Sequence, residues 1–475
     1  MLEPCLTGSA VKRSAWPVNL LFITSDHQRA DSIGLTQAGR VVTPHLNALA
    51  AQGTHFTRAY SACPLCVPAR AALATGLRPA RNGVTWNDWQ GRHARDVVTL
   101  HERLATAGYT LGHTGMDHVR LGRRLRERAP FAVWLDETDH EKHLGTRGCN
   151  LAALEASGPF RKKVTERIGD TVLRQDYSTP HVAAWPFARE DFRDEFFTRR
   201  AEAALAELAA GDNPFALFVN LWAPHPPFYV PPELMNVFPP DDITLPENIG
   251  RPAEGEPRNR REGVAAQLAA GIDEAGWRRA WSAHLALTHM VDLLVGRLLT
   301  ALERHGVADD TLIVFTSDHG EHLGQHALYQ KMELYEPAAR VPLIFAGAGL
   351  AAQPPVATPV SHLDVVPTVL THLGLSMPAG LDGRPLNATL HGGDLATVPV
   401  FTQFTGNSGP SVARYAVIHG DHKLILDTDD QPELYDLAAD PLEMQNRAGD
   451  PALAQTTGRL AQLLTTYLAA GPDVT

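Results

Sequence analysis

The run Cys66-Val67-Pro68-Ala69-Arg70 combines a nucleophile with an anion-binding arrangement. Pro68 suits the first turn of a helix, so a helix is predicted to begin beside Cys66. The positive end of a helix dipole stabilises a bound anion, and Arg70 falls on the same helix face one turn later. A sulfur nucleophile beside a guanidinium indicates chemistry on sulfate or phosphate esters. The alternative is an inert buried cysteine beside a surface arginine.

Reactive side chains also follow four strand-like segments. In chain order they are Asp26-His27, His118, His225 and Asp318-His319. In an open α/β sheet, functional groups gather just beyond the carboxyl ends of the strands. Carboxylates paired with imidazoles suit a divalent metal, so the two Asp-His pairs predict a metal site. The alternative for each pair is an aspartate that caps the helix or turn after its strand.

Apolar runs of strand length alternate with helix-like segments along the chain. The strand-like runs at residues 18–24, 215–223 and 311–317 are nearly all apolar, as expected for strands buried on both faces. Helices are expected at residues 97–108 and at about 277–304. This alternation predicts an α/β fold in which a large, mostly parallel sheet is flanked by helices.

The pattern changes near residue 391. Residues 414–427 have the alternation of a β-hairpin, and a final helix is expected at about residues 452–469. We therefore predict a catalytic α/β domain over residues 1–390 and a small C-terminal α+β domain over residues 391–475.

Residues 238–263 are rich in proline, aspartate, glutamate and arginine. They are expected to form an exposed excursion from the core. Such an excursion could shape the entrance to a site or a contact in a homo-oligomer, and the sequence leaves both open.

Composition limits the class of protein. The chain has 475 residues, of which 44% are hydrophobic and 20% charged, a globular balance. The net charge of −11 argues against general binding to nucleic acid or an anionic membrane. No apolar run approaches the ~20 residues of a membrane span, and the N-terminus lacks the pattern of a signal peptide. Four cysteines (Cys5, Cys63, Cys66 and Cys149) form no disulfide framework, so a reduced, cytoplasmic protein is expected.

The motif at residues 66–76 resembles the signature of the formylglycine-dependent sulfatases of the alkaline phosphatase superfamily. Cys66, Pro68 and Arg70 stand at the family's spacing, whereas Cys63 is followed at once by proline. Further segments resemble family landmarks in the same order: residues 43–60, 317–345, 361–374 and 433–446. The resemblance covers most of the chain and implies an α/β hydrolase of sulfuric esters.

The resemblance also implies a modification of the nucleophile. In the family, a separate maturation enzyme oxidises the motif cysteine, here Cys66, to formylglycine. One hydroxyl of the hydrated aldehyde attacks sulfur, and the second breaks the covalent intermediate and releases sulfate. By position, the metal ligands are Asp26, Asp318, His319 and residue 66, with His27 as a further ligand.

Other residues match the family's catalytic positions. Arg70 would orient the diol, and His118 would be the base that collapses the intermediate. His225 is a candidate general acid near the leaving oxygen. Lys331 would contact the sulfate and the leaving group, the alternative being a solvated surface lysine.

One segment departs from the family pattern. Many sulfatases carry Gly-Lys-x-His where this chain has Gly115-Met116-Asp117-His118, so one cation facing the sulfate is missing. Asn87, a candidate substrate-binding residue, is instead similar to a position of the phosphonate monoester hydrolases and choline sulfatases. The Asp-His pair that ends in residue 319 has the same similarity.

Three functions are therefore weighed. The first is a sulfuric ester hydrolase with formylglycine at position 66 and one divalent metal, acting on a small-molecule sulfate ester. The second is a phosphonate monoester or phosphodiester hydrolase, because such esters carry the same single negative charge. The third is a non-catalytic anion-binding relative. Family habit suggests Ca²⁺, whereas two histidines favour Mn²⁺ or Zn²⁺.

Overall fold

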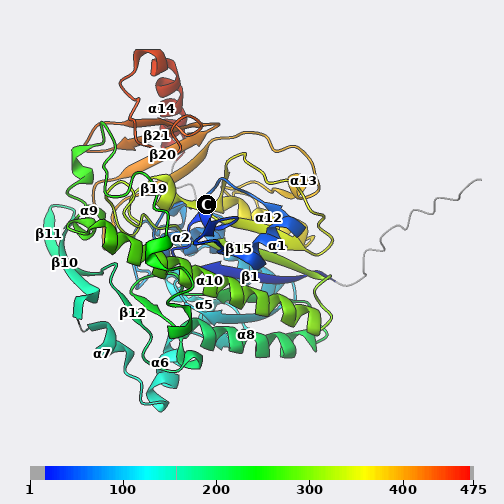
Figure 1. Cartoon of the computed structure of the whole chain (residues 1–475). Helices are drawn as coiled ribbons and strands as arrows, with labels where there is room; N and C mark the ends of the chain where they lie inside the picture. Colours follow the sequence, from blue (N-terminus) through cyan, green and yellow to red (C-terminus); the bar gives the residue numbers. More distant parts are fainter. Residues whose placement is uncertain (1–16, 157, 471–475) are drawn as a thin grey trace, which may run out of the picture.

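The computed structural model describes residues 17–156 and 158–470. The predictions about the N-terminal leader and Cys5 lie outside these residues. A sheet of seven strands lies at the centre of the molecule (Figure 1). The strand order is β4-β17-β15-β1-β13-β6-β9. In that order the bounds are Thr54–His55, Leu343–Gly347, Thr311–Ser317, Asn19–Ser25, Phe215–Asn220, Thr110–Gly115 and Phe131–Leu135. Strands β15, β1, β13, β6 and β9 are parallel, β17 runs antiparallel to β15, and the edge strand β4 runs antiparallel to β17. The predicted mostly parallel sheet is confirmed.

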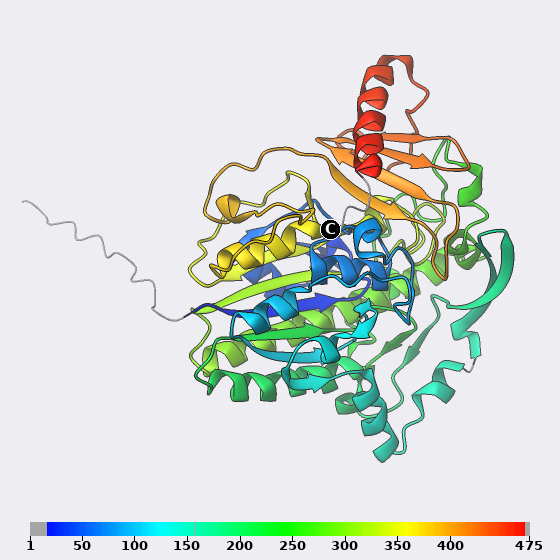
Figure 2. The same cartoon turned by 180° about the vertical axis from the view of Figure 1, so that it is seen from behind.

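Helices cover both faces of this sheet. Alternate residues of β1 point to opposite sides, so Leu21 and Ile23 belong to one core and Leu20 and Phe22 to the other. The first core includes residues of α1 (Pro44–Gln52), α8 (Arg193–Ala209) and α10 (Glu274–Arg304). The second includes residues of α2 (Cys66–Thr75), α4 (Leu100–Thr106) and α12 (Val365–His372), seen in front of the sheet in Figure 2.

Two helices differ slightly from their predicted bounds. Helix α4 begins three residues later than expected, because Thr99 caps it and forms a capping box with Glu102. Helix α10 begins earlier, after Asp273, whose side chain accepts a hydrogen bond from the backbone N–H of Gly276. By length and composition alone α10 could cross a membrane, but 78% of its most apolar stretch is buried inside the protein. It is the central helix of the first core.

The C-terminal region holds a second, antiparallel sheet of β19 (Val400–Phe404), β20 (Arg414–His419), β21 (His422–Asp427) and β22 (Glu433–Asp436). The predicted hairpin is confirmed, because His419 pairs with His422 across its turn. Helix α14 (Ala454–Ala469) packs on this sheet and stands at the top of Figure 1. The domain boundary at residue 391 stays a prediction.

Smaller elements complete the described chain. The minor strands are β2 (Thr36–Gln37), β3 (Arg40–Val41), β5 (Ala59–Tyr60), β7 (Arg120–Leu121), β8 (Arg123–Arg124), β10 (Arg161–Ile168), β11 (Thr171–Ser178), β12 (Val182–Ala184), β14 (Phe228–Val230), β16 (Arg340–Val341) and β18 (Val360–Ser361). The short helices are α3 (Pro79–Asn82), α5 (Leu125–Arg128), α6 (Glu137–Thr146), α7 (Leu151–Ala156), α9 (Val264–Ala269), α11 (Glu336–Ala339) and α13 (Asn387–Leu390).

The predicted exposed excursion at residues 238–263 is wrong in part. Phe238 and Arg260 are fully buried, and Ile243 is nearly so. The guanidinium of Arg260 forms ion pairs with carboxylates that lie far away in the sequence, among them Asp427. A charge-rich composition predicts exposure only when the charges lack buried partners, and these partners cannot be identified from local sequence.

Candidate active site

Cys66 is the first residue of α2 and is 2% exposed. One helical turn later, Arg70 donates from Nε to Asp318 Oδ2 at 3.0 Å and from Nη2 to Asp26 Oδ2 at 3.1 Å. The helix begins at Cys66 as predicted, and Arg70 lies one turn later on the same helix face, also as predicted. The guanidinium links α2 to two carboxylates that follow β1 and β15.

The two Asp-His pairs lie side by side because of strand register. Strands β1 and β15 are parallel neighbours, and Ser25 pairs with Ser317. The residues that follow each strand therefore leave the sheet at the same edge. Four ligand atoms, one each from Asp26, His27, Cys66 and His319, lie within 4.8 Å of one another.

Each imidazole in this group has one unprotonated nitrogen that faces the site. His319 donates from Nδ1 to the carbonyl of Gly320 at 3.0 Å, which leaves the lone pair of Nε2 facing Cys66 Sγ at 3.4 Å. His27 accepts a hydrogen bond from Lys331 on Nε2, so its Nδ1 carries the proton and donates to Glu321 at 2.8 Å. Burial lowers the pKa of both imidazoles, that of His319 to about 3. Neutral imidazoles with oriented second nitrogens are typical metal ligands.

Asp318 is placed differently from the predicted ligand set. Its Oδ1 accepts from the backbone N–H groups of His27 at 3.4 Å and His319 at 2.9 Å, and its Oδ2 accepts from Arg70. It lies outside the group of four ligand atoms, although Oδ1 is 3.7 Å from His319 Nε2. Its role as a ligand stays a prediction.

The pKa values of the two buried carboxylates are shifted in opposite directions. Burial and the neighbouring Asp318 raise the pKa of Asp26 to about 7. Burial alone would raise the pKa of Asp318, but the protonated form of His319 and the guanidinium of Arg70 outweigh it and lower the pKa to about 2. A divalent cation at Asp26 would favour its ionised form. The donor set of one carboxylate and two neutral imidazoles around position 66 therefore fits a divalent cation.

Lys331 is a buried cation that faces neutral groups. Its Nζ lies 2.7 Å from His27 Nε2, 2.9 Å from Cys66 Sγ and 3.5 Å from His225 Nε2. In the described chain, no carboxylate oxygen lies within 4.0 Å of this ammonium group. Burial lowers the pKa of Lys331, but attraction to the ionised forms of Cys66 and Asp26 outweighs it, so the net shift is upward. A buried ammonium with no adjacent carboxylate suits an anionic ligand.

His118 and His225 complete the cluster. His225 donates from Nδ1 to the carbonyl of Pro226, so its Nε2 accepts from Lys331. His118 lies with Nδ1 3.9 Å from Asp26 Oδ2, and this nitrogen has no hydrogen-bond partner among the described residues. Burial lowers the pKa of both imidazoles, so both are neutral bases in the folded chain. The ring of Trp222 is near both, with its centroid 3.9 Å from that of His225 and 6.2 Å from that of His118.

Asn87 serves the helix that carries Cys66. Its Oδ1 accepts from the backbone N–H of Val67 at 3.1 Å, and its Nδ2 donates to Asn407 at 2.8 Å. Both polar ends of the side chain therefore contact protein. The predicted contact with substrate stays a prediction, and the observed contacts hold the start of α2.

The segment that departs from the sulfatase pattern is buried. Met116 packs with Phe196 and Phe197 of α8. Asp117 accepts from Arg120 and Arg124, both at 2.9 Å, so its charge is balanced outside the cluster.

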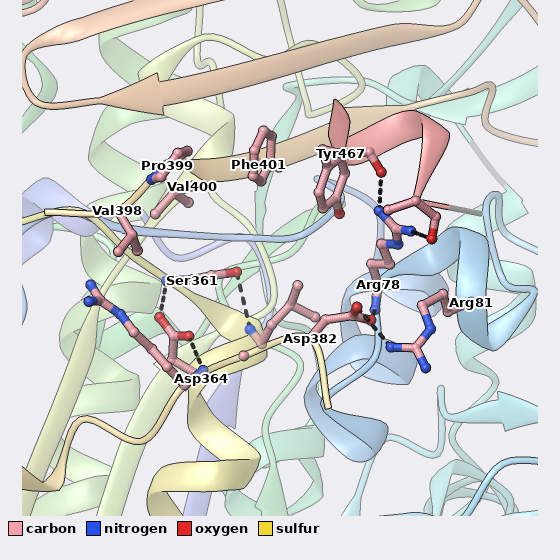
Figure 3. Close-up of a pocket in the computed structure, with 14 residues that line it drawn as sticks. Arg78, Arg81, Ser361, Asp364, Asp382, Val398, Pro399, Val400, Phe401 and Tyr467 are labelled. Atoms are coloured by element: carbon pink, nitrogen blue, oxygen red, sulfur yellow. Dashed lines mark hydrogen bonds and ion pairs between the residues drawn. The ribbon is translucent and has the colours of Figure 1, made fainter. Parts of the chain in front are cut away.

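A separate cavity of about 470 Å³ is lined by residues of α3, β19 and α14, among them Arg81, Phe401 and Tyr467 (Figure 3). Its polar side chains are engaged with protein partners: Arg78 donates to the carbonyls of Tyr467 and Ala470, and Arg81 pairs with Asp382 at 2.9 Å. None of the predicted site residues lines it.

Comparison with known proteins identifies the family. A family model for sulfatases matches residues 18–375, about three quarters of the chain. The chain belongs to the sulfatase family. A second model, described as the C-terminal part of N-sulphoglucosamine sulphohydrolase, matches residues 324–469. Membership of a hydrolase family disfavours the non-catalytic alternative.

Individual relatives of this sulfatase span both leading functions. It is 31% identical to a multifunctional alkaline phosphatase superfamily protein of Trinickia caryophylli, with 94% of each chain covered. It is 29% identical to a choline-sulfatase of Rhizobium meliloti, over 91% of this chain and 83% of that protein. The structure of a phosphonate monoester hydrolase from Silicibacter pomeroyi is similar with a TM-score of 0.76 and 25% identity, over 96% of each chain.

Sequence reasoning missed two residues of the sulfatase site. Glu321 orients His27, and Trp222 contacts His225. Glu321 follows His319 by two residues, so a search for acids near the second Asp-His pair could have found it. Trp222 precedes His225 by three residues, but an aromatic residue at a strand end gives no signal of its own.

Proposed function

We propose that this sulfatase hydrolyses sulfate esters with a formylglycine at position 66 and one divalent cation. The position of Cys66 supports the proposal: Sγ lies 2.9 Å from Lys331 Nζ, 3.4 Å from His319 Nε2 and 3.7 Å from Asp26 Oδ1. A nucleophile at this point has a cation on one side and metal-binding groups on the other.

The unmodified thiol is poorly suited to the reaction. Burial, followed by the charge of Asp26, raises the pKa of Cys66 well above its usual range, so the sulfur is protonated at neutral pH. The thiolate is the nucleophilic form of cysteine. A formylglycine at this position supplies a hydrated aldehyde, which offers one hydroxyl for attack and a second for release of the product.

The proposed cation would be held by Asp26, His27, His319 and residue 66, with Asp318 as a further candidate ligand. When bound, it would supply Lewis-acid polarisation of oxygen atoms. Two imidazole nitrogens in the donor set favour Mn²⁺ or Zn²⁺ over the Ca²⁺ of family habit.

The chain's own residues bind the anion and move protons. Arg70 and Lys331 supply positive charge beside the nucleophile. Neutral His118 is suited to act as the base. His225 is neutral and accepts a hydrogen bond, whereas Lys331 carries protons, so we assign proton donation to the leaving oxygen to Lys331, directly or through His225.

A second candidate function is hydrolysis of phosphonate monoesters or phosphodiesters. The relatives named above favour it, and so does Met116, because the chain offers one cation fewer than Gly-Lys-x-His sulfatases. Phosphonate monoesters carry the same single negative charge as sulfate esters, so one pocket accommodates both.

Kinetics on matched p-nitrophenyl sulfate and p-nitrophenyl phenylphosphonate test the proposal. We expect turnover of the sulfate by protein co-expressed with a formylglycine-generating enzyme, accompanied by turnover of the phosphonate. Cys66→Ser is expected to lose on the order of 10³-fold or more in kcat, because a serine ester lacks the second hydroxyl. Cys63→Ser is the matched control and should keep full activity. Hydrolysis of the phosphonate without hydrolysis of the sulfate would contradict the first function and support the second.

We further propose that the maturation enzyme acts before the chain folds. Cys66 is 2% exposed, and the whole of α2 is buried, so a second protein has no access to it in the folded state. A cytoplasmic location, with no nucleic-acid or membrane partner, remains part of the proposal.

A further inference from the structure

The backbone that carries Lys331 is held in an unfavourable conformation. Five residues near it other than glycine have positive φ angles: Leu323 (47°), His326 (57°), Ala327 (53°), Gln330 (68°) and Met332 (81°). Two of them are the direct neighbours of Lys331. Such conformations persist only where the surroundings enforce them, so this segment must be anchored by contacts on both sides.

The first charged anchor after Lys331 is Glu333, which is 2% exposed and forms two ion pairs. Its Oε1 lies 3.0 Å from Nη1 of Arg414, and its Oε2 lies 3.3 Å from Nε of Arg260. Arg414 belongs to β20 of the C-terminal sheet, whereas Arg260 precedes α9. Both guanidinium groups also contact Asp427, which fixes them to β21.

The residues that follow Glu333 are anchored to the same sheet. The hydroxyl of Tyr335 donates to Glu433 Oε2 at 2.6 Å, and Glu336 Oε1 lies 3.1 Å from Nζ of Lys423. The segment after Lys331 is therefore clamped onto the C-terminal sheet over four residues.

Lys331 itself has no comparable anchor. Its ammonium contacts two imidazoles and the sulfur of Cys66, and no carboxylate lies within 4.0 Å in the described chain. Its position beside the nucleophile is therefore determined by its backbone rather than by an ion pair. A backbone that relaxed at Gln330 or Met332 would move Nζ away from position 66.

We propose that Glu333, held by Arg260 and Arg414, is a positioning residue that keeps Lys331 at the reacting atoms. The inference rests on the proposed function, in which Lys331 assists the leaving group. It makes the C-terminal sheet part of the catalytic apparatus, although that sheet supplies none of the residues around Cys66.

The test is a double-mutant cycle with Glu333→Gln and Lys331→Met. The Gln variant keeps the shape of the side chain and removes its charge. We expect Glu333→Gln to lower kcat by about 10- to 100-fold on phenyl sulfate, whose leaving group is poor, with little change in KM. On p-nitrophenyl sulfate, whose leaving group needs less assistance, the loss should be several times smaller. In the Lys331→Met background, Glu333→Gln should cost almost nothing further, because it acts through Lys331.

Controls separate positioning from stability. Asp292→Asn is a matched buried carboxylate change, because Asp292 accepts hydrogen bonds from the backbone N–H groups of His45 and Leu46 at the start of α1. Any loss in kcat that it causes should be the same for both substrates, and this loss should add in full to that of Lys331→Met in the double variant. Arg414→Lys, which keeps a positive charge beside Asp427 and shortens the contact with Glu333, tests the same anchor from the other partner, should Glu333→Gln fail to fold. Formylglycine content is measured by mass spectrometry in every variant, and rates are expressed per modified chain.

Two results would overturn the inference, and they differ. An impaired Lys331→Met enzyme to which Glu333→Gln adds its full cost would overturn the positioning role alone. A Lys331→Met enzyme with wild-type rates on both substrates would overturn the assignment of Lys331 in the proposed function and, with it, this inference.

Discussion

Two buried groups of charges in this sulfatase are built differently. In the C-terminal ion cluster (Arg260, Glu333, Arg414, Asp427 and Glu433), each guanidinium contacts at least two carboxylates. In the catalytic centre around Cys66, Arg70 is balanced in the same way, but Lys331 faces only imidazoles and sulfur. Removing one partner from a compensated buried group of charges strongly destabilises a fold, whereas an uncompensated cation indicates a place for an anion.

Removing a cation from the ion cluster should cause the largest loss of stability. Arg260→Met leaves Glu333, Asp427 and Glu433 with less positive charge in a buried site, so we expect a loss of about 3–5 kcal/mol in the free energy of unfolding. Denaturant unfolding followed by fluorescence measures it. Arg123→Met, on an exposed arginine, should change stability by no more than about 0.5 kcal/mol. Equal stabilities of the two variants would contradict the structural role of the cluster.

Removing a buried cation from the catalytic centre should lower turnover and leave stability unharmed, the reverse of its effect in the ion cluster. Lys331→Met removes a buried ammonium that has no carboxylate neighbour, so stability should stay equal or rise. Turnover should fall by about 10²- to 10³-fold, because a charge beside the reacting atoms is lost. Steady-state kinetics and a thermal melt on one preparation measure both. If Lys331→Met lost stability and kept its turnover, the contrast between Lys331 and the ion cluster would be contradicted.

Metal binding should depend on Glu321, although Glu321 is not itself in the proposed ligand set. It contacts Nδ1 of His27, whereas the nitrogen of His27 that would bind the metal is Nε2. Glu321→Gln should weaken binding by about 10- to 100-fold, because a carboxylate raises the basicity of the imidazole that it holds. The measurement is metal content per chain by mass spectrometry after dialysis against buffered Mn²⁺ or Zn²⁺. Glu166→Gln, a buried glutamate bound to Tyr177, is the control. Unchanged metal content in Glu321→Gln would remove His27 from the ligand set.

The smallest effect is expected at Met116. Met116→Lys should shift the ratio of kcat/KM values toward sulfate over phosphonate, but by no more than about tenfold. The side chain packs with Phe196 and Phe197, so a lysine there must extend out of an apolar cluster to reach the anion. Competition kinetics on the matched p-nitrophenyl esters measure the ratio. An unaltered ratio in a folded variant would show that this position has no part in substrate choice.

The residues around Cys66 were predictable because parallel strands bring their carboxyl ends to one edge. The apolar runs located β1 and β15, and the Asp-His pairs that follow them had to meet once the strands became neighbours. The ion cluster was not predictable in this way. Arg260 lies 173 positions from Glu433 in the sequence. A local excess of charged residues predicts that their side chains are exposed to solvent, and it does not reveal a buried partner far away in the chain. Backbone strain at Gln330 and Met332 has no sequence signal either, because neither residue type favours a positive φ.

The central claim is that position 66 carries the nucleophile as formylglycine. The most direct measurement pairs mass spectrometry of the Cys66 peptide with turnover number, across preparations made with different amounts of the maturation enzyme. We predict that turnover rises in proportion to the formylglycine fraction and extrapolates to zero for protein that is entirely thiol. Full turnover from protein whose Cys66 is unmodified would contradict the account.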